Sequence, residues 1–144
     1  MRVVVQRTIE SSAKVDNKII GKIGNGLTIL VGFGKNDGSK EIDYLVNKII
    51  NLRIFDDENG VMNKSLLDVN GSILSISQFT LYADTSKGRR PSYFNAHGDA
   101  LSLYNEFNEK LRNYVNVETG EFGADMEVSL VNDGPVTIIL ETGD

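Results

Sequence analysis

Two stretches of apolar residues with helical spacing, set among segments rich in β-branched residues, constrain the fold of this chain most. In the first stretch the apolar residues recur at i, i+3, i+4, i+7 and i+8: Ile42, Leu45, Val46, Ile49 and Ile50. The second stretch has a similar stripe: Ala100, Leu103, Tyr104, Phe107, Leu111 and Tyr114. Ser39 and Asp99 are suitable N-cap residues at the two starts. The pattern predicts two amphipathic helices, each laying one apolar face on a sheet.

Strands are expected before, between and after these helices. The segments with strand composition are residues 2–9, 18–23, 27–33, 73–82, 125–131 and 136–141, with a turn at residues 132–135. The order strands, helix, strand, helix, strands predicts an α+β fold with a mixed or antiparallel sheet. A chain of 144 residues, 40% of them hydrophobic, can build one core, so we expect a single domain over residues 1–144.

The strand expected at residues 73–82 changes character toward its end. Leu74 and Ile76 lie on one face of it. Because side chains alternate along a strand, Gln78 and Thr80 should continue that face with polar groups. Such a strand either runs from the core into a cleft or emerges into solvent, and the pattern alone favours emergence.

The inventory of catalytic side chains is small. The chain has no cysteine and its only histidine is His97, which excludes thiolate chemistry and Cys/His metal centres. We expect no metal ion and no cofactor. A surface or helix-capping role is the better interpretation of His97, because no neighbour in sequence suggests a triad.

Thr80 is a candidate nucleophile, but the sequence identifies no base to activate it. Residues 32–38 fit neither common phosphate-binding motif and indicate a glycine turn.

Charge is distributed unevenly along the chain. The net charge of −5 argues mildly against a nucleic-acid partner. Residues 1–22 nevertheless hold five basic and two acidic residues, residues 87–90 form a second basic cluster, and residues 115–144 contain no lysine or arginine. Solvated surface is the commoner explanation of such segregation, and a phosphate-binding face is the alternative.

No apolar run suits a signal peptide or a membrane span, so we expect a cytoplasmic protein without membrane contact.

Four segments carry a resemblance to a known family: Val4-Val5-Gln6-Arg7, Ser77-Gln78-Phe79-Thr80-Leu81-Tyr82, Gly88-Arg89-Arg90-Pro91-Ser92 and Asn132-Asp133-Gly134-Pro135-Val136-Thr137. In this order and at this spacing, they make the chain similar to the D-aminoacyl-tRNA deacylases, homodimeric proofreading enzymes that remove D-amino acids from tRNA. The resemblance covers the whole chain and implies that family's fold, a single-domain β-barrel-like sheet with two main helices. Tyr93-Phe94 departs slightly from the commoner phenylalanine after Pro-Ser.

The resemblance implies how the configuration of the amino acid is read. Gly134 and Pro135 would form a Gly-cisPro element that enters the active site of the partner subunit and leaves no space for an L side chain. Arg7 would support this element by hydrogen bonds. Sequence alone predicts a trans Gly-Pro bond, because only about 5–6% of X-Pro bonds in folded proteins are cis.

The resemblance also implies an active site formed by Ser77, Gln78, Phe79 and Thr80 around the ester carbonyl and the 3′-terminal adenosine of aminoacyl-tRNA. Backbone N–H groups near Phe79 and Thr80 would stabilise the developing oxyanion. The 2′-hydroxyl of the terminal ribose would help to activate water, so that no side-chain base is required. A nucleophilic Thr80 is the alternative.

The implied substrates are D-aminoacyl-tRNAs and, because glycine has no side chain to exclude, glycyl-tRNA, whereas L-aminoacyl-tRNA would be spared. Two other functions stay open at this point. One is a non-catalytic tRNA-binding module on the same scaffold. The other is a general esterase or peptidase, which the lack of a credible triad disfavours.

Overall fold

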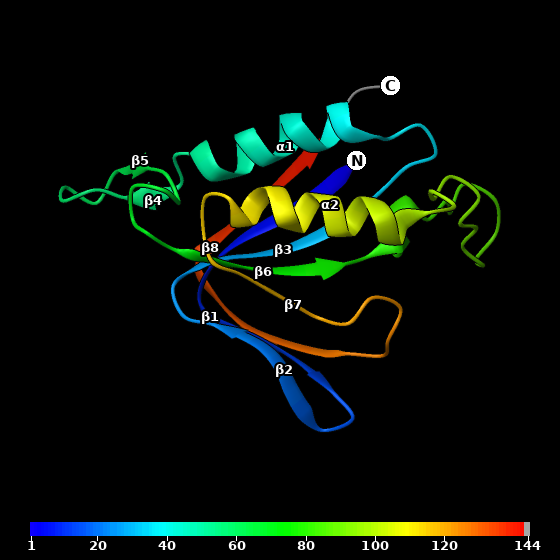
Figure 1. Ribbon diagram of the computed structural model, residues 1–144, viewed down its shortest axis with the longest axis horizontal. Helices are drawn as coiled ribbons and strands as arrows, with labels where there is room; N and C mark the ends of the chain where they lie inside the picture. Colours follow the sequence, from blue (N-terminus) through cyan, green and yellow to red (C-terminus); the bar gives the residue numbers. More distant parts are fainter. Residues whose placement is uncertain (143–144) are drawn as a thin grey trace.

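The computed structural model describes residues 1–142, which form a mixed β-sheet with two α-helices on one face (Figure 1). The elements in chain order are β1 (Arg2–Val15), β2 (Lys18–Ile23), β3 (Gly26–Gly32), α1 (Ser39–Asn51), β4 (Phe55–Asp56), β5 (Met62–Lys64), β6 (Ser72–Ser77), the 3₁₀ helix η1 (Phe79–Tyr82), α2 (Ala100–Arg112), β7 (Val117–Thr119) and β8 (Glu127–Glu141).

The long strand β1 organises the sheet. Its first half, Arg2 to Thr8, pairs antiparallel with β3, and its second half, from Ser11 to Val15, pairs antiparallel with β2. Strand β8 pairs antiparallel with both halves. Parallel pairings then add β6 to β3 and β7 to β6. The sheet is therefore mixed, and the predicted α+β class is confirmed.

The sheet curls until its two ends almost meet, which gives it a barrel-like form. Its path runs β2-β1-β3-β6-β7, so β2 and β7 are the ends. They come close at Gly21, where an added Cβ would lie 2.5 Å from the carbonyl oxygen of Thr119. Glycine permits this approach because it has no Cβ. A small apolar cluster fills the interior: Ala13, Ile23, Leu74 and Ile76.

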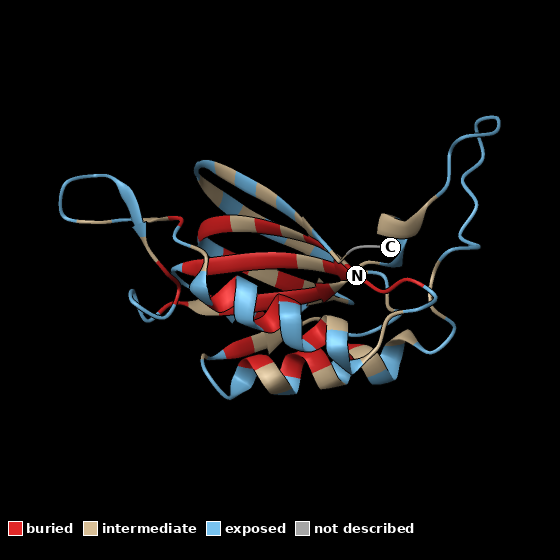
Figure 2. Ribbon diagram, turned by 90° about the horizontal axis from the view of Figure 1, so that it is seen from above, coloured by how far each residue is buried: buried red, intermediate tan, exposed pale blue. Residues whose placement is uncertain are grey.

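The two helices cover the outer face of this sheet, and the main hydrophobic core lies between them and the strands (Figures 1 and 2). The α1 stripe is buried as predicted: Ile42, Leu45, Val46, Ile49 and Ile50. In α2, Tyr104, Phe107 and Leu111 are buried as well. The prediction that Tyr114 belongs to this buried stripe is wrong. It follows the C-terminal end of α2 and is 57% exposed.

The helix starts were predicted almost correctly. The N-cap of α1 is Gly38 rather than Ser39, and the Gly38 N–H donates to Oε2 of Glu41 at 3.0 Å. Asp99 is the N-cap of α2, where its carboxylate accepts from the N–H of Ser102 at 3.4 Å. Both contacts satisfy backbone donors that have no partner within the helix.

Two strand predictions are wrong in ways that affect the site. The strand expected at residues 73–82 ends at Ser77, and the chain then turns into η1, so Gln78 and Thr80 do not continue the face of Leu74 and Ile76. The residues expected as two strands and a turn form one continuous strand, β8. The register explains this continuity: Gln6 pairs with Thr137 and Thr8 with Asn132, so the extra residues of β8 form a bulge rather than a turn.

Candidate active site

An open cleft of about 860 Å³ lies where β6 leads into η1. Three segments line it: Ile76 to Phe79, Ala96 to Leu101, and Phe122 to Val128 except Glu127. Ser77, Gln78 and Phe79 line the cleft together, although the residue pattern alone favoured emergence of this segment into solvent. Thr80 is exposed and is not part of the lining. The segment from Phe122 to Met126 was not predicted as part of the site, because it has no motif of its own.

Glycines at the end of β3 allow η1 to pack against the sheet. A Cβ added to Gly32 would lie 2.9 Å from the carbonyl oxygen of Gln78, and one added to Gly34 would lie 2.8 Å from Cε1 of Tyr82. Both contacts are too short for any other residue to be accommodated without a shift. The predicted glycine turn thus provides the space in which η1 packs. The Gly-x-Gly spacing at residues 32–34 is the sequence feature that indicates this close packing.

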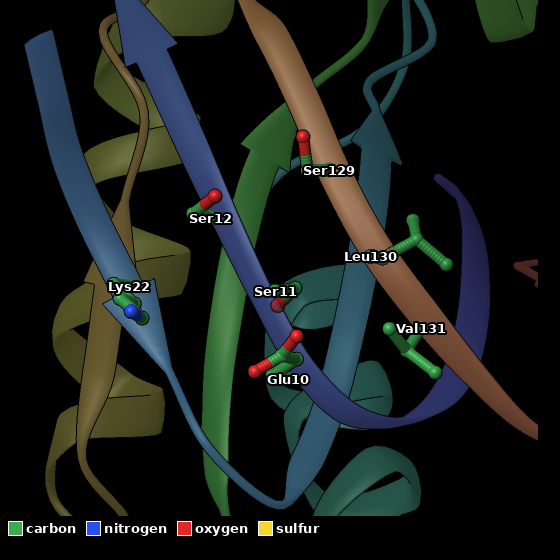
Figure 3. A pocket seen from close by; sticks show the side chains of 7 residues that line it. All are labelled: Glu10, Ser11, Ser12, Lys22, Ser129, Leu130 and Val131. Atoms are coloured by element: carbon green, nitrogen blue, oxygen red, sulfur yellow. The ribbon is translucent and has the colours of Figure 1, made fainter.

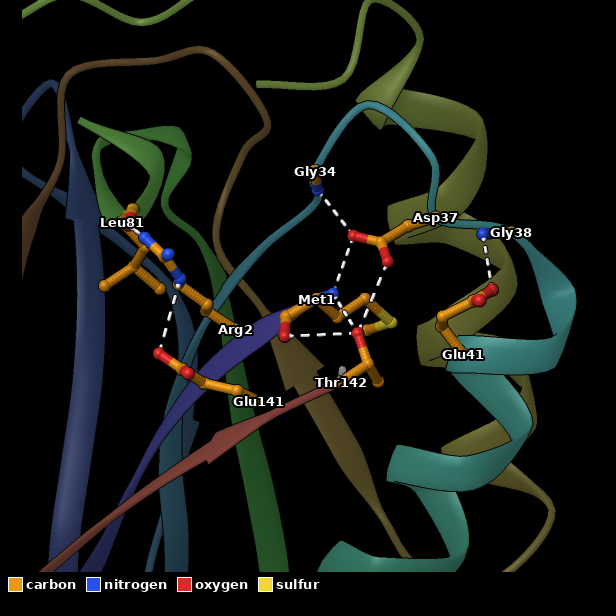
Figure 4. A network of polar contacts seen from close by, with 9 residues as sticks. All are labelled: Met1, Arg2, Gly34, Asp37, Gly38, Glu41, Leu81, Glu141 and Thr142. Carbon is orange, nitrogen blue, oxygen red and sulfur yellow. Dashed lines mark hydrogen bonds and ion pairs between the residues drawn. The ribbon is translucent and has the colours of Figure 1, made fainter. Parts of the chain in front are cut away.

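The first residue of β1 holds η1 from the other side (Figure 4). The Arg2 guanidinium donates from Nη1 to the carbonyl of Leu81 at 2.8 Å and lies 4.6 Å from the centre of the Tyr82 ring. Its Nε is 3.4 Å from the Glu141 carboxylate. Burial, and then the negative charge of Asp37, raise the pKa of Tyr82 to about 12. The 3₁₀ helix is therefore held by Arg2, which Glu141 contacts at the same end of the β1–β8 pair.

Asp37 is the centre of a second set of contacts in Figure 4. The amino group of Met1 lies 2.7 Å from Oδ2 of Asp37, and the Gly34 N–H donates to the same oxygen. The N–H of Thr142 donates to the carbonyl of Met1 at 2.9 Å. These contacts connect the loop after β3 to the start of β1 and the end of β8. This loop includes Gly34, against which η1 packs.

The side chains beside η1 offer no activated nucleophile. The Thr80 hydroxyl accepts a hydrogen bond from the side-chain amide of Gln78, and no carboxylate or imidazole among residues 1–142 bonds to it. The backbone N–H groups of Phe79 and Thr80 lie in the first turn of η1, and they donate to no acceptor in the described chain. The N–H of Phe79, which lines the cleft, and the N–H of the adjacent Thr80 therefore have no acceptor among the described residues.

His97 also lines the cleft. Its Nδ1 accepts from the N–H of Asp99 at 2.9 Å, which makes it part of the cap at the start of α2. This agrees with the capping role predicted for it. The sequence did not predict that the capping segment would line the same cleft as Ser77 and Phe79, because that relation depends on how α2 packs on the sheet.

Gly134 and Pro135 lie in the bulge of β8 and are exposed. Their peptide bond is cis, and Gly134 has a φ of +126°. Arg7, which is only 8% exposed, contacts the residue before them: its Nε donates to the carbonyl of Asp133 at 3.1 Å. Its Nη1 donates to the carbonyl of Ile54 at 2.8 Å. Arg7 thus contacts the Gly-Pro segment as the resemblance implied.

Within one chain, the two predicted parts of the site lie far apart. Ser77 is two strands away from β1, at the level of Val3. Gly134 follows Asp133, whose carbonyl accepts from Arg7, and Arg7 lies four residues beyond Val3 along β1. Because Gly134 lies on β8, on the side of β1 away from β3, the separation is roughly 13 Å along the strand and roughly 14 Å across three strands, which together give roughly 19 Å. One chain therefore does not bring Gly134 into its own cleft.

A second hollow, of about 170 Å³, lies on the outer surface of β1, β2 and β8 (Figure 3). Its lining consists of Glu10, Ser11, Ser12, Lys22, Ser129, Leu130 and Val131. None of the predicted site residues reaches it, and its serines have no histidine beside them. We therefore assign the chemistry to the larger cleft.

Residues 1–142 contain no group of three or more His, Asp or Glu side chains placed to hold a metal ion. Within the same residues, no helix is long and apolar enough to cross a membrane.

Comparisons with known proteins point in one direction. A sequence profile described as D-Tyr-tRNA(Tyr) deacylase matches residues 4–141. The chain is 59% identical to the D-aminoacyl-tRNA deacylase of Thermosipho africanus (strain TCF52B) over 145 residues, which cover 99% of this chain and 97% of that protein. It is 58% identical, with the same coverage, to the D-aminoacyl-tRNA deacylase of Clostridium botulinum (strain Langeland / NCTC 10281 / Type F).

Solved structures share the fold over nearly the whole chain. The structure described as c-Myc DNA Unwinding Element Binding Protein superposes with a TM-score of 0.95 at 41% identity, covering 100% of both chains. A probable eukaryotic D-amino acid tRNA deacylase superposes with a TM-score of 0.82, covering 96% of this chain and 97% of that one. At 19% identity, the second similarity concerns the fold alone.

Proposed function

Because the chain belongs to the D-aminoacyl-tRNA deacylase family, we propose that it hydrolyses D-aminoacyl-tRNA in the cleft beside η1. It is an enzyme, and its reaction is cleavage of the ester that joins a D-amino acid to tRNA. Water adds to the ester carbonyl, the bond between the carbonyl carbon and the ribose oxygen breaks, and that oxygen takes a proton. The products are free D-amino acid and tRNA. Since the substrate belongs to translation, the proposed place of action is the cytoplasm.

The observation that carries the mechanism is the pair of unused N–H groups at Phe79 and Thr80. Negative charge develops on the carbonyl oxygen as water adds, and backbone donors fixed in place stabilise it without reorganisation. One such donor typically contributes a factor of about 10² to 10³ in rate. No carboxylate or imidazole of the described residues bonds to the Thr80 hydroxyl, so the activation of water is assigned to the 2′-hydroxyl of the terminal ribose. Catalysis then depends on position and electrostatics rather than on a side-chain nucleophile.

Selection for D-amino acids is assigned to Gly134 and Pro135 of a second subunit. These residues are exposed, the segment before them is bonded to Arg7, and strand geometry places them roughly 19 Å from the cleft of their own chain. A symmetric homodimer would place each Gly-Pro segment at the partner's cleft. Their carbonyl groups would face the Cα and amino group of the substrate and exclude an L side chain. Glycine has nothing to exclude, so glycyl-tRNA is also a substrate.

The test of this function compares purified protein on D-tyrosyl-tRNA, L-tyrosyl-tRNA and glycyl-tRNA. We expect rapid release of D-tyrosine and glycine, and release of L-tyrosine near the uncatalysed rate. Comparable rates for D- and L-tyrosyl-tRNA would contradict the selection mechanism. Tight binding of all three with no release would instead indicate the non-catalytic tRNA-binding module.

The Thr80→Ala variant tests the role of the hydroxyl separately. Because the only bond of this hydroxyl within residues 1–142 is with the Gln78 amide, we expect the variant to retain activity within about tenfold of the wild type. Single-turnover deacylation of D-tyrosyl-tRNA measures this directly. Ser39→Ala, which removes an exposed hydroxyl at the start of α1, a helix that does not line the cleft, serves as the control. A fall of Thr80→Ala to the uncatalysed rate would restore the nucleophile mechanism.

A further inference from the structure

The loop of residues 84–92, called the basic loop below, projects from the body of the protein just beyond η1. All of its residues are exposed, and Figure 2 shows the long exposed segment extending away from the sheet. It contains Lys87, Arg89 and Arg90. Their side chains form no hydrogen bond or ion pair with any residue of the described chain, whereas Lys110, for example, contacts both Asp43 and Glu106.

Backbone hydrogen bonds join the two ends of the basic loop at Asp84 and Ser92, so that its tip projects beyond them. The Asp84 N–H donates to the carbonyl of Ser92 at 2.7 Å, and the Ser92 N–H donates back at 2.9 Å. Oδ1 of Asp84 accepts from the N–H of Ser86 at 2.9 Å. The one carboxylate of the loop is thus engaged with the backbone at its base. The three cations lie beyond that closure, in residues 87–90.

Aromatic contacts fix the base of the basic loop to the wall of the cleft. The ring of Tyr93 packs edge-on against Phe79 with the ring centres 4.9 Å apart. The N–H of Lys35 donates to the carbonyl of Asn95 at 3.2 Å, and the Lys35 ammonium lies over the ring of Phe94. Lys35 is itself exposed and adds a fourth positive charge on this side of the cleft. The base of the basic loop therefore has a defined position beside Phe79, and the cations at its tip extend from that position.

We propose that the basic loop binds backbone phosphates of the tRNA acceptor arm while the 3′ end occupies the cleft. This inference rests on the proposed function, because it takes the RNA from that function and adds the surface that holds it. A protein with a net charge of −5 repels RNA at long range, so binding requires cations concentrated where the RNA leaves the site. Arg89 and Arg90 can each donate to a phosphate in a bidentate manner.

The test uses a charge-neutral double variant, Arg89→Gln with Arg90→Gln. Its matched control is Lys40→Gln with Lys48→Gln, which removes two exposed charges from α1, a helix that does not line the cleft. Both are assayed for kcat/KM on D-tyrosyl-tRNA and on the minimal ester 3′-D-tyrosyl-adenosine, which has the same reacting bond and no acceptor arm.

For the basic-loop variant, we expect the ratio of kcat/KM on tRNA to kcat/KM on the minimal ester to fall about tenfold or more. The salt dependence of log(kcat/KM) on tRNA should become less steep by about 1 to 2, since roughly 0.9 is expected for each lost duplex phosphate contact. The α1 variant should leave both quantities at their wild-type values.

Other results separate the two levels of inference. If the wild-type protein hydrolyses neither substrate, the proposed function is wrong. If it hydrolyses both and the basic-loop variant matches the α1 variant, the loop does not bind the acceptor arm. Equal losses on both substrates would also contradict the inference, because they would mean that the loop shapes the cleft. A larger effect from Lys18→Gln with Lys22→Gln on β2 would place RNA on the strand face instead.

Discussion

At the level of single residues, the buried side chain of Arg7 donates to the backbone carbonyl of the residue before Gly134. The Arg7 guanidinium donates to the carbonyl groups of Asp133 and Ile54, and it lies 3.4 Å from the Asp56 carboxylate. Its charge is therefore compensated although the side chain is only 8% exposed. Asp56 and Asp133 are each about half exposed, so much of their interaction with Arg7 is screened by solvent.

Gly134→Ala tests the close fit of this segment. An added Cβ would lie 2.9 Å from Cγ2 of Val136 and 3.1 Å from Nη2 of Arg7, at a φ of +126° that disfavours any L side chain. We expect a loss of about 1 to 3 kcal/mol in the free energy of unfolding, measured by urea denaturation. Gly60→Ala is the control, because Gly60 also has a positive φ but no atom within 4 Å of an added Cβ. Equal losses would show that crowding at Gly134 is unimportant.

Tyr82→Phe tests the raised pKa beside η1. The phenol has a pKa of about 12 in the folded protein against 10.0 normally, because burial and Asp37 disfavour its charged form. A raised acid pKa stabilises the folded state below pH 10, and this contribution is lost as the pH rises from 10 to about 12. Wild type should therefore lose more stability than Tyr82→Phe over that window, as measured by urea midpoints. Tyr44→Phe, which removes an exposed tyrosine, is the control, and an equal change in both variants would exclude the effect.

At the level of elements, the helices were predictable and the parts of the site were not. The α1 stripe repeats every 3.6 residues over several turns, and this signal comes from the chain itself. By contrast, residues 78–82 alternate like a strand but form η1, because Gly32 and Gly34 leave room for a turn packed on β3. That room belongs to another strand, so the local pattern around Phe79 cannot reveal it.

The bulge in β8 illustrates the same limit. Asn-Asp-Gly-Pro is typical of a turn, and the sequence favoured one at residues 132–135. In the structure β1 pairs with β8 on both sides of these residues, and the pairing of Thr8 with Asn132 holds the strand together. Tertiary pairing therefore overrides the local preference. The local motif therefore did not predict the backbone conformation of residues 132–135.

Tyr104→Phe tests how α2 supports the strand that enters the cleft. The Tyr104 hydroxyl donates to the carbonyl of Ser75 at 2.6 Å, two residues before Ser77, and both partners of this bond are buried. Removing the hydroxyl should lower the free energy of unfolding by about 1 to 2 kcal/mol, because a buried carbonyl loses a donor. Tyr114→Phe, at an exposed position after the same helix, should change it by less than about 0.5 kcal/mol. Similar effects of the two changes would mean that the hydrogen bond contributes little.

At the level of the whole molecule, β8 is an edge strand with exposed apolar side chains on the face directed away from the helices. Ile139 is 66% exposed and pairs with Val4, which pairs in turn with Leu30, so the three side chains form a row across β8, β1 and β3. Exposed apolar rows of this kind are typical of surfaces that other proteins cover. Of this row, Ile139 lies on β8, the same strand as the Gly-Pro bulge. The sequence could not locate this surface, because it depends on which strand is left unpaired at the edge.

Ile139→Lys tests whether this row belongs to the subunit interface. A lysine there would have to be desolvated on association, so we expect dissociation to monomers in sedimentation velocity at micromolar concentration. Deacylation of D-tyrosyl-tRNA should fall with the dimer fraction, because each cleft would lose the Gly134 of its partner. Ile19→Lys on β2, which is 54% exposed in the wild type, is the control. An Ile139→Lys protein that remains dimeric would place the interface elsewhere.

Both arginines that hold the proposed site belong to one strand. Arg2 positions η1 and Arg7 positions the segment before Gly134, and they lie five positions apart on β1, roughly 16 Å of extended chain. The strand thus sets the distance between the two elements that one subunit would contribute, η1 to its own pocket and Gly134 to that of its partner, and a two-fold axis would repeat that distance in both subunits. Inserting or deleting a single residue between the arginines would turn one of them to the other face of the sheet. The length of this stretch is therefore as important to the pocket as the identity of the two side chains.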